Sequence, residues 1–178
     1  MHEAILEFWF EELQPAQWWK KDASFDAMII ERYAELHAQA AQCELYTWRR
    51  TGQGRLAEII ILDQFPRNMY RDSAHAFATD PLALALAQEA VATGADAALS
   101  AIQRSFLYMP YMHSESPRIH ELALDLYTRN GLKDNLAFES KHKDIIDRFG
   151  RYPHRNAILG RQSTAEEIEF LKQPGSSF

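Results

Sequence analysis

The sequence has a single cysteine, no long apolar run and no excess of positive charge. Because Cys43 is alone, an internal disulfide and any metal site built on a cysteine pair are excluded. No run of about 18 apolar residues occurs, so the sequence predicts no membrane span. The formal net charge of −6 argues against a protein that holds nucleic acid through its phosphates. Glutamates interrupt the apolar N-terminal segment, which lacks a basic start, so we expect no signal peptide and a cytoplasmic protein.

Several signatures of cofactor chemistry are also missing. The phosphate-binding patterns G-x-G-x-x-G and G-x-x-x-x-G-K-[ST] do not occur. The nucleophile elbow G-x-S-x-G is absent as well. The seven histidines include no pair four residues apart and no H-E-x-x-H pattern. We therefore predict no cofactor and no protein-bound metal ion.

What the sequence does contain is helical periodicity in a chain of ordinary composition. Its 178 residues are 47% apolar and 25% charged, which is typical of one globular domain. An apolar stripe on Ile5, Leu6, Trp9 and Leu13 predicts a first helix that ends at Pro15. Ten Phe, seven Tyr and four Trp predict a well-packed core. This aromatic surplus also fits a homodimer, although no feature specifies an interface.

Capping residues and prolines bound the other predicted helices. The run Ile59–Ile61 has the composition of a buried strand, but its flanks favour a buried helix. The predicted helices lie from Ser24 to about Ala41, around Leu56–Ile61 before Pro66, from Asp80-Pro81 to near Gly94, from about Ala97 to Tyr108, from Pro117 to Asn130-Gly131, from Lys133 to Phe149, and from Ser163-Thr164 to before Pro174. About eight helices with short connections and no strand pattern predict an all-α stack in a single domain over residues 1–178.

Three segments are richer in polar side chains than a structural loop requires: 63–71, 108–115 and 148–161. From Lys141 to Arg161 there are six basic residues and two acidic ones. Arginine binds carboxylate or phosphate through two parallel hydrogen bonds, so an anionic ligand would suit this segment. The alternative is that these arginines pair with acidic residues of the chain and need no ligand.

The tripeptide His113-Ser114-Glu115 contains the side-chain types of a base, a nucleophile and an orienting acid. Neighbouring side chains on a helix diverge by about 100°, so these three cannot form a relay with one another. A role for His113 or Glu115 as general acid or base with groups from other segments stays open. The alternative is a buried His and Glu that tie helices together. Pro117 predicts a helix break between His113 and His120.

Longer segments of the chain resemble a known family. They are LEFWFEEL, WWKKDASFD, GRLAEIIILDQFPRN, AFATDPLALALA, FLYMPYMHSE, HKDIIDRFGRYPHRN, ILGRQST and the terminal Phe. Nearly the whole chain resembles the bacterial domain-of-unknown-function family numbered 924. The resemblance implies a tetratricopeptide-like (TPR-like) helical stack and supplies no function. The family's signature positions fall on Asp63, Gln64, Arg67, Asn68, His113, Ser114, Glu115, Arg148, His154, Arg155 and Asn156.

Three hypotheses follow for these residues. In the first, the protein binds an anionic small molecule or peptide in a concavity. The candidate ligand-binding residues are Asp63, Gln64, Arg67, Asn68, Ser114, Arg148, Arg155 and Asn156. In the second, the protein is a cofactor-independent hydrolase or lyase. Its candidate catalytic residues are His113, Glu115 and His154, with Asp63 as an alternative orienting carboxylate.

In the third hypothesis, the whole polar network is structural. The three hypotheses predict different arrangements of these side chains. An enzyme needs a carboxylate within hydrogen-bond reach of a histidine whose second nitrogen faces a water-accessible pocket. A binding protein needs only the arginines and concave access, and a structural network is buried with every group paired.

Overall fold

The computed structural model describes residues 1–178, and the predicted all-α fold is confirmed. The α-helices are α1 (His2–Glu7), α2 (Ala23–Ala41), α3 (Gly52–Asp63), α4 (Phe65–Met69), α5 (Asp80–Ala92), α6 (Ala101–Leu107), α7 (Met109–Met112), α8 (Pro117–Asn130), α9 (Lys133–Phe149) and α10 (Ala165–Leu171). A π-helical segment, η1 (Phe8–Glu12), continues α1. The 3₁₀ turns are η2 (Pro15–Trp18), η3 (Tyr46–Arg50), η4 (Ala74–Phe77), η5 (Ala95–Ala98) and η6 (Pro153–Arg155).

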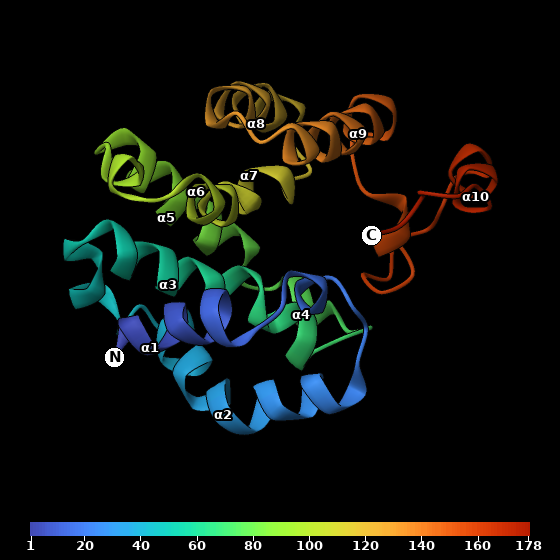
Figure 1. The fold of residues 1–178 in the computed structure, drawn as a ribbon. Coiled ribbons are helices and arrows are strands. Elements are labelled where there is room, and N and C mark those ends of the chain that lie inside the picture. Colours follow the sequence, from blue (N-terminus) through green and yellow to red (C-terminus); the bar gives the residue numbers. More distant parts are fainter.

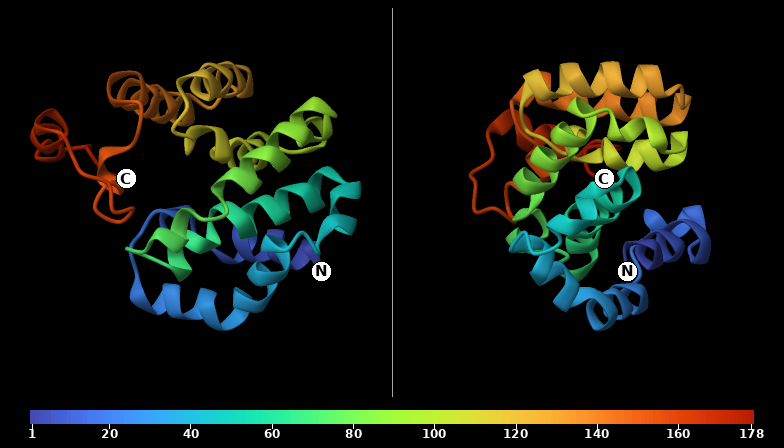
Figure 2. Two further views of the ribbon diagram at one scale, coloured as in Figure 1. Left: turned by 180° about the vertical axis from the view of Figure 1, so that it is seen from behind. Right: turned by 90° about the vertical axis from the view of Figure 1, so that its left-hand side faces the viewer.

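The helices follow one another through space in the order of the chain. Helices α1 to α4 form the lower half of the view in Figure 1, α5 to α7 lie above them, and α8 and α9 pair at the top. Helix α10 stands to the side of this body, as both Figure 1 and the left view of Figure 2 show. No helix is both long enough and apolar enough to cross a bilayer. The TPR-like relationship stays a prediction from the resemblance.

Helix α3 is the centre of the core. Its residues from Leu56 to Leu62 have no measurable exposure, and α1, α2, α5 and α6 all contact it. Apart from Glu58, which pairs with Arg49, this stretch is apolar on all sides. Such a helix is stable only when it is enclosed, which is why the Ile59–Ile61 run folds as a buried helix. Close packing reaches the backbone at Gly54, where a Cβ atom would overlap the carbonyl oxygen of Trp48. The last residue of this rigid helix is Asp63, so the fold fixes that carboxylate in place.

Two predicted helix boundaries were wrong, and both errors have local causes. Helix α2 begins after Asp22, whose carboxylate accepts hydrogen bonds from the amides of Ser24 and Phe25, so Asp22 is the N-cap instead of Ser24. The helix predicted from Ala97 to Tyr108 is divided, because Ser100 caps a new helix, α6, in a capping box with Gln103.

Other local signals were read correctly. The capping box at Thr164 starts α10, and the chain breaks between α7 and α8, with Pro117 as the first residue of α8, as the predicted break between His113 and His120 requires.

Candidate functional site

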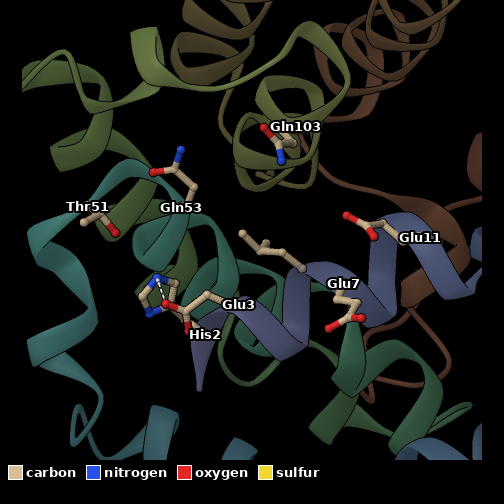
Figure 3. Close-up of a pocket in the computed structure, with 8 residues that line it drawn as sticks. His2, Glu3, Glu7, Glu11, Thr51, Gln53 and Gln103 are labelled. Carbon is tan, nitrogen blue, oxygen red and sulfur yellow. Dashed lines mark ion pairs between the residues drawn. The ribbon is translucent and has the colours of Figure 1, made fainter.

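Two surface depressions are the main candidates for a ligand site, and the larger of the two lacks a buried polar anchor. It has a volume of about 510 Å³ and lies beside α1, where Glu3, Glu7 and Glu11 follow one face of the helix (Figure 3). These glutamates are exposed, and the only side chain of the lining that carries positive charge when protonated is His2, which faces Glu3. The lining consists of His2, Glu3, Leu6, Glu7, Glu11, Thr51, Gln53 and Gln103. The second depression, which contains a buried polar group, is therefore the better candidate for a functional site.

The second depression, called the Arg155 pocket below, has a volume of about 370 Å³. It lies where the start of α5, the end of α7 and the turn η6 meet. It thereby brings together two of the three predicted polar segments, 108–115 and 148–161. The lining residues are Ala74, Phe77, Ala78, Asp80, Pro81, Leu84, Pro110, His113, Ser114, Glu115, Arg155 and Leu159.

Arg155 is the buried cation of this pocket. Its side chain is 7% exposed, and the guanidinium lies over the rings of Phe77 and Tyr152, at 4.5 and 4.7 Å from their centroids. Stacking of this kind fixes the plane of the guanidinium without using its N–H groups. The guanidinium donates no hydrogen bond to the protein, and its Nε atom is buried without a partner. Burial lowers the pKa of Arg155, and the positive charge of Arg67 lowers it further.

Asp80 is the nearest carboxylate to Arg155, and it is already engaged. The Nη1 atom of Arg155 lies 3.6 Å from Oδ2 of Asp80, which is beyond hydrogen-bond distance. Both oxygens of Asp80 accept from Arg67, at 2.9 and 3.0 Å, in a two-pronged pair. Arg67 also donates to the backbone carbonyl of Asp63. The donors of Arg155 are therefore left for a group that enters the pocket.

His113 faces the same pocket and is oriented by Asp63. Its Nδ1 atom lies 2.8 Å from Oδ1 of Asp63, a carboxylate that is 1% exposed and also accepts from Gln64. Burial alone raises the pKa of Asp63, but the charge of Arg67 and the hydrogen bond with His113 outweigh it and hold this pKa below its ordinary range. Asp63 is therefore ionised and accepts the Nδ1 proton.

The second imidazole nitrogen of His113 is free. Nε2 has no hydrogen-bond partner in the protein, and the side chain is 14% exposed into the pocket. Burial lowers the pKa of His113, and Arg67 lowers it further. At neutral pH, the imidazole is thus uncharged and presents the Nε2 lone pair to the pocket.

Glu115 lines the pocket but does not orient His113. Its carboxylate accepts two hydrogen bonds from Arg161, at 2.6 and 2.9 Å, and one from the amide of Tyr152 at 2.7 Å. Of the two partners proposed for His113, the geometry selects Asp63. Ser114 also lines the pocket, and its Oγ accepts from the amide of Ser116. Glu115 and Arg161 clamp the 113–116 segment to the start of η6.

Seven of the eleven predicted site residues do not line the pocket, and four of these seven make their contacts elsewhere. Asn68 donates to Asp26, Asn156 bridges Ser163 and Arg161, and Arg148 pairs with exposed Glu166 on the surface. His154 packs against Phe178, with its Nδ1 atom buried and unpartnered. Burial, together with the charge of Arg155, lowers the pKa of His154 to about 4. The structure thus brings His113, Ser114, Glu115 and Arg155 together, with Asp63, Gln64 and Arg67 behind them.

Sequence reasoning missed the apolar wall of the pocket and a buried pair that supports it. The wall comes from Phe77, Leu84 and Leu159, whose types are equally typical of a core. The buried pair is His120 and Glu139, both with no exposure, at 2.7 Å between Nδ1 and Oε1. His120 donates its Nε2 proton to the carbonyl of Ser114, because a carbonyl can only accept. The pair therefore holds the segment that carries His113.

The chain contains no cluster of three or more His, Cys, Asp or Glu side chains with the geometry of a metal site.

Residues 5–175 match the profile of a family described as "Bacterial protein of unknown function (DUF924)". Comparison with curated proteins gives no match. Among solved structures, a protein of unknown function from Agrobacterium tumefaciens is similar to this chain, with 42% sequence identity, a TM-score of 0.91 and coverage of 96% of each chain.

Proposed function

The chain belongs to the DUF924 family of bacterial proteins of unknown function, and we propose that it binds an anionic small molecule in the Arg155 pocket. The observation that carries this proposal is Arg155 itself. A guanidinium that is 7% exposed and donates no hydrogen bond to the protein is costly to bury, unless a bound anion accepts its hydrogen bonds. Carboxylates and phosphates match the planar donor geometry of arginine.

The size and lining of the pocket favour a small molecule over a peptide. A volume of about 370 Å³ is near the lower end of the range for small-molecule sites. Most of the lining is apolar, and the polar groups are few and converge from three segments. This is the usual composition of a site that encloses a small ligand and orients it through a few polar contacts.

We propose that the protein acts in the cytoplasm, since its one cysteine, Cys43, is a free thiol.

A thermal-shift series with and without Arg155 tests the proposal. We expect a panel of acetate, benzoate and inorganic phosphate to contain at least one anion that raises the melting temperature of the wild type. At a concentration of about 100 times the Kd, the stabilisation is about 2.7 kcal/mol, or a shift of roughly 5 to 11 °C. Arg155→Met removes the donors and should abolish the shift.

Arg148→Met is the matched control. Arg148 also stacks on an aromatic ring, that of Phe149, but it pairs with Glu166 outside the pocket. This variant should respond to the anion as the wild type does. If Arg155→Met keeps the full shift, or no anion of the panel shifts the wild type, the proposal is wrong.

The Asp63–His113 pair favours a second candidate function, that of a cofactor-independent enzyme. An ionised, buried carboxylate fixes the tautomer of His113 and leaves Nε2 free, which is the arrangement of a general base. Arg155 would then hold the carboxylate of a substrate while His113 removes a proton from it or from water. Turnover of a carboxylate-bearing ester that is lost in His113→Gln would favour catalysis. Binding without turnover would favour the first proposal.

A further inference from the structure

The charged groups around the Arg155 pocket cancel one another before any ligand enters. Three carboxylates face three guanidinium groups, and His113 is uncharged at neutral pH. The six groups are Asp63, Asp80, Glu115, Arg67, Arg155 and Arg161. Because charges in buried surroundings are stable only when they are balanced, a bound anion leaves this cluster with an excess of negative charge. Each further charge on the ligand adds to that excess.

His113 is placed to restore the balance. Its Nδ1 proton is already committed to Asp63, and a second proton can enter at Nε2 without breaking that hydrogen bond. The charged and titratable groups that face His113 are Asp63 from α3, Arg67 from α4, Asp80 from α5, Glu115 and Arg155 at the pocket, His142 from α9 and His154 from η6.

The two neighbouring histidines are poorer acceptors. His142 donates its Nδ1 proton to the carbonyl of Phe138, and both His142 and His154 pack against the ring of Phe178. Neither of them lines the Arg155 pocket. The imidazole with a free nitrogen at the ligand is that of His113.

The apolar lining of the pocket indicates the chemistry of the rest of the ligand. Apart from the polar groups, the lining is formed by Ala74, Phe77, Ala78, Pro81, Leu84, Pro110 and Leu159. Such a surface gains from burial of an apolar body and gives a second charge or a polar tail no partner. A ligand that matches this lining has one charged head, which binds Arg155, and one apolar body.

We propose that the pocket takes a singly charged carboxylate with an apolar body, and that His113 gains a proton at Nε2 when this carboxylate binds Arg155. This inference rests on the proposed anion binding and specifies its ligand class. Charge neutrality is kept by uptake of one proton for each ligand. A doubly charged phosphate ester, by contrast, leaves the cluster negative even after His113 is protonated.

Isothermal titration calorimetry with three probes tests the proposal. Benzoate has the charge and the apolar ring, phenyl phosphate has the same ring with a dianionic head at about pH 8, and acetate has the head alone. Titration in two cationic buffers with different ionisation enthalpies gives the number of protons taken up. We expect benzoate to bind about tenfold or more tightly than either of the others. We also expect about one proton to be taken up per benzoate, as linkage requires.

Two variants identify the histidine that takes up the proton when benzoate binds. His113→Gln should still bind benzoate through Arg155, but without proton uptake and with no dependence of the Kd on pH. His154→Gln should keep the uptake. Benzoate binding without proton uptake, tighter binding of phenyl phosphate, or uptake that is lost in His154→Gln and kept in His113→Gln would each overturn this inference. Those outcomes leave anion binding intact, whereas failure of all three probes to bind overturns the proposed function itself.

Discussion

Replacing Asp63 with asparagine should destabilise the protein strongly, although the two side chains have the same shape. Asp63 is 1% exposed, and its carboxylate faces Arg67 at 3.6 Å and His113 at 2.8 Å. Loss of one partner from a buried ion pair costs about 3 to 5 kcal/mol. Arg67 keeps its two-pronged pair with Asp80, so we expect the lower end of that range, about 3 kcal/mol. For a chain of this length, this is a fall of roughly 6 to 12 °C in melting temperature.

The pH dependence of this loss identifies the carboxylate as its source. The pKa of Asp63 is depressed in the folded state from its ordinary value of 3.8. A group with a depressed pKa stabilises the fold above the unfolded pKa, and this contribution disappears as the pH falls through the folded value. The difference in the free energy of unfolding between wild type and Asp63→Asn should therefore not shrink between neutral pH and about pH 5. It should narrow only below 3.8.

Urea denaturation at several pH values measures this gap through linear extrapolation. Asp125→Asn is the control, because Asp125 pairs with Arg129 on the surface with 63% of its side chain exposed, and no change is expected there. A loss below about 1 kcal/mol at neutral pH would refute a buried ion pair. A gap that already narrows above about pH 5 would mean that His113, and not Asp63, is the titrating group.

Two further substitutions test the packing that supports the site. Gly54→Ala should cost more than about 3 kcal/mol in urea unfolding or prevent folding, because its Cβ overlaps the carbonyl of Trp48 in the enclosed helix α3. Gly94→Ala, where φ is 71° and a Cβ meets nothing, should cost only about 1 to 2 kcal/mol, and equal losses would contradict this reasoning. Tyr152→Phe should cost about 1 to 3 kcal/mol, because it leaves the buried carbonyl of Met112 without its hydrogen bond. Unchanged stability would show that water or another donor replaces the hydroxyl.

The fold was predictable where the signals are local. Glycines at 131 and 150 end α8 and α9 with φ of 80° and 68°, as a glycine C-cap requires. The buried helix α3 could be recognised from its flanks because helical context extends over several residues. The boundary at Ser100 was missed, since the alanine-rich run before it has a high helix propensity that hides the capping box.

The site was predictable only in part, because its geometry depends on long-range packing. Polar residues that stand out in the sequence could be found, but their partners could not. Asp63 and His113 are 50 residues apart, and only the packing of α3 against the later helices brings them together. Glu115 is two residues from His113 and was an equally good candidate until its pairing with Arg161 was visible. The apolar wall carries no signal that distinguishes a pocket from a core.

Arg155 also separates the structural hypothesis from the functional ones, because the two predict opposite effects on stability. If the polar network only holds the protein together, removing Arg155 must weaken it. The neighbouring arginines have their own carboxylates, Arg67 with Asp80 and Arg161 with Glu115, whereas Arg155 has none within hydrogen-bond distance. Burying a guanidinium whose N–H groups donate to no acceptor costs stability, and this cost is recovered only when an anion binds. Arg155→Met removes this cost, and protonation of His113 can rebalance the remaining charges, so the variant should be about as stable as the ligand-free wild type while it loses the response to anions. A variant that instead melts well below the wild type, with Arg148→Met unchanged, would show that Arg155 belongs to the structure and not to a binding site.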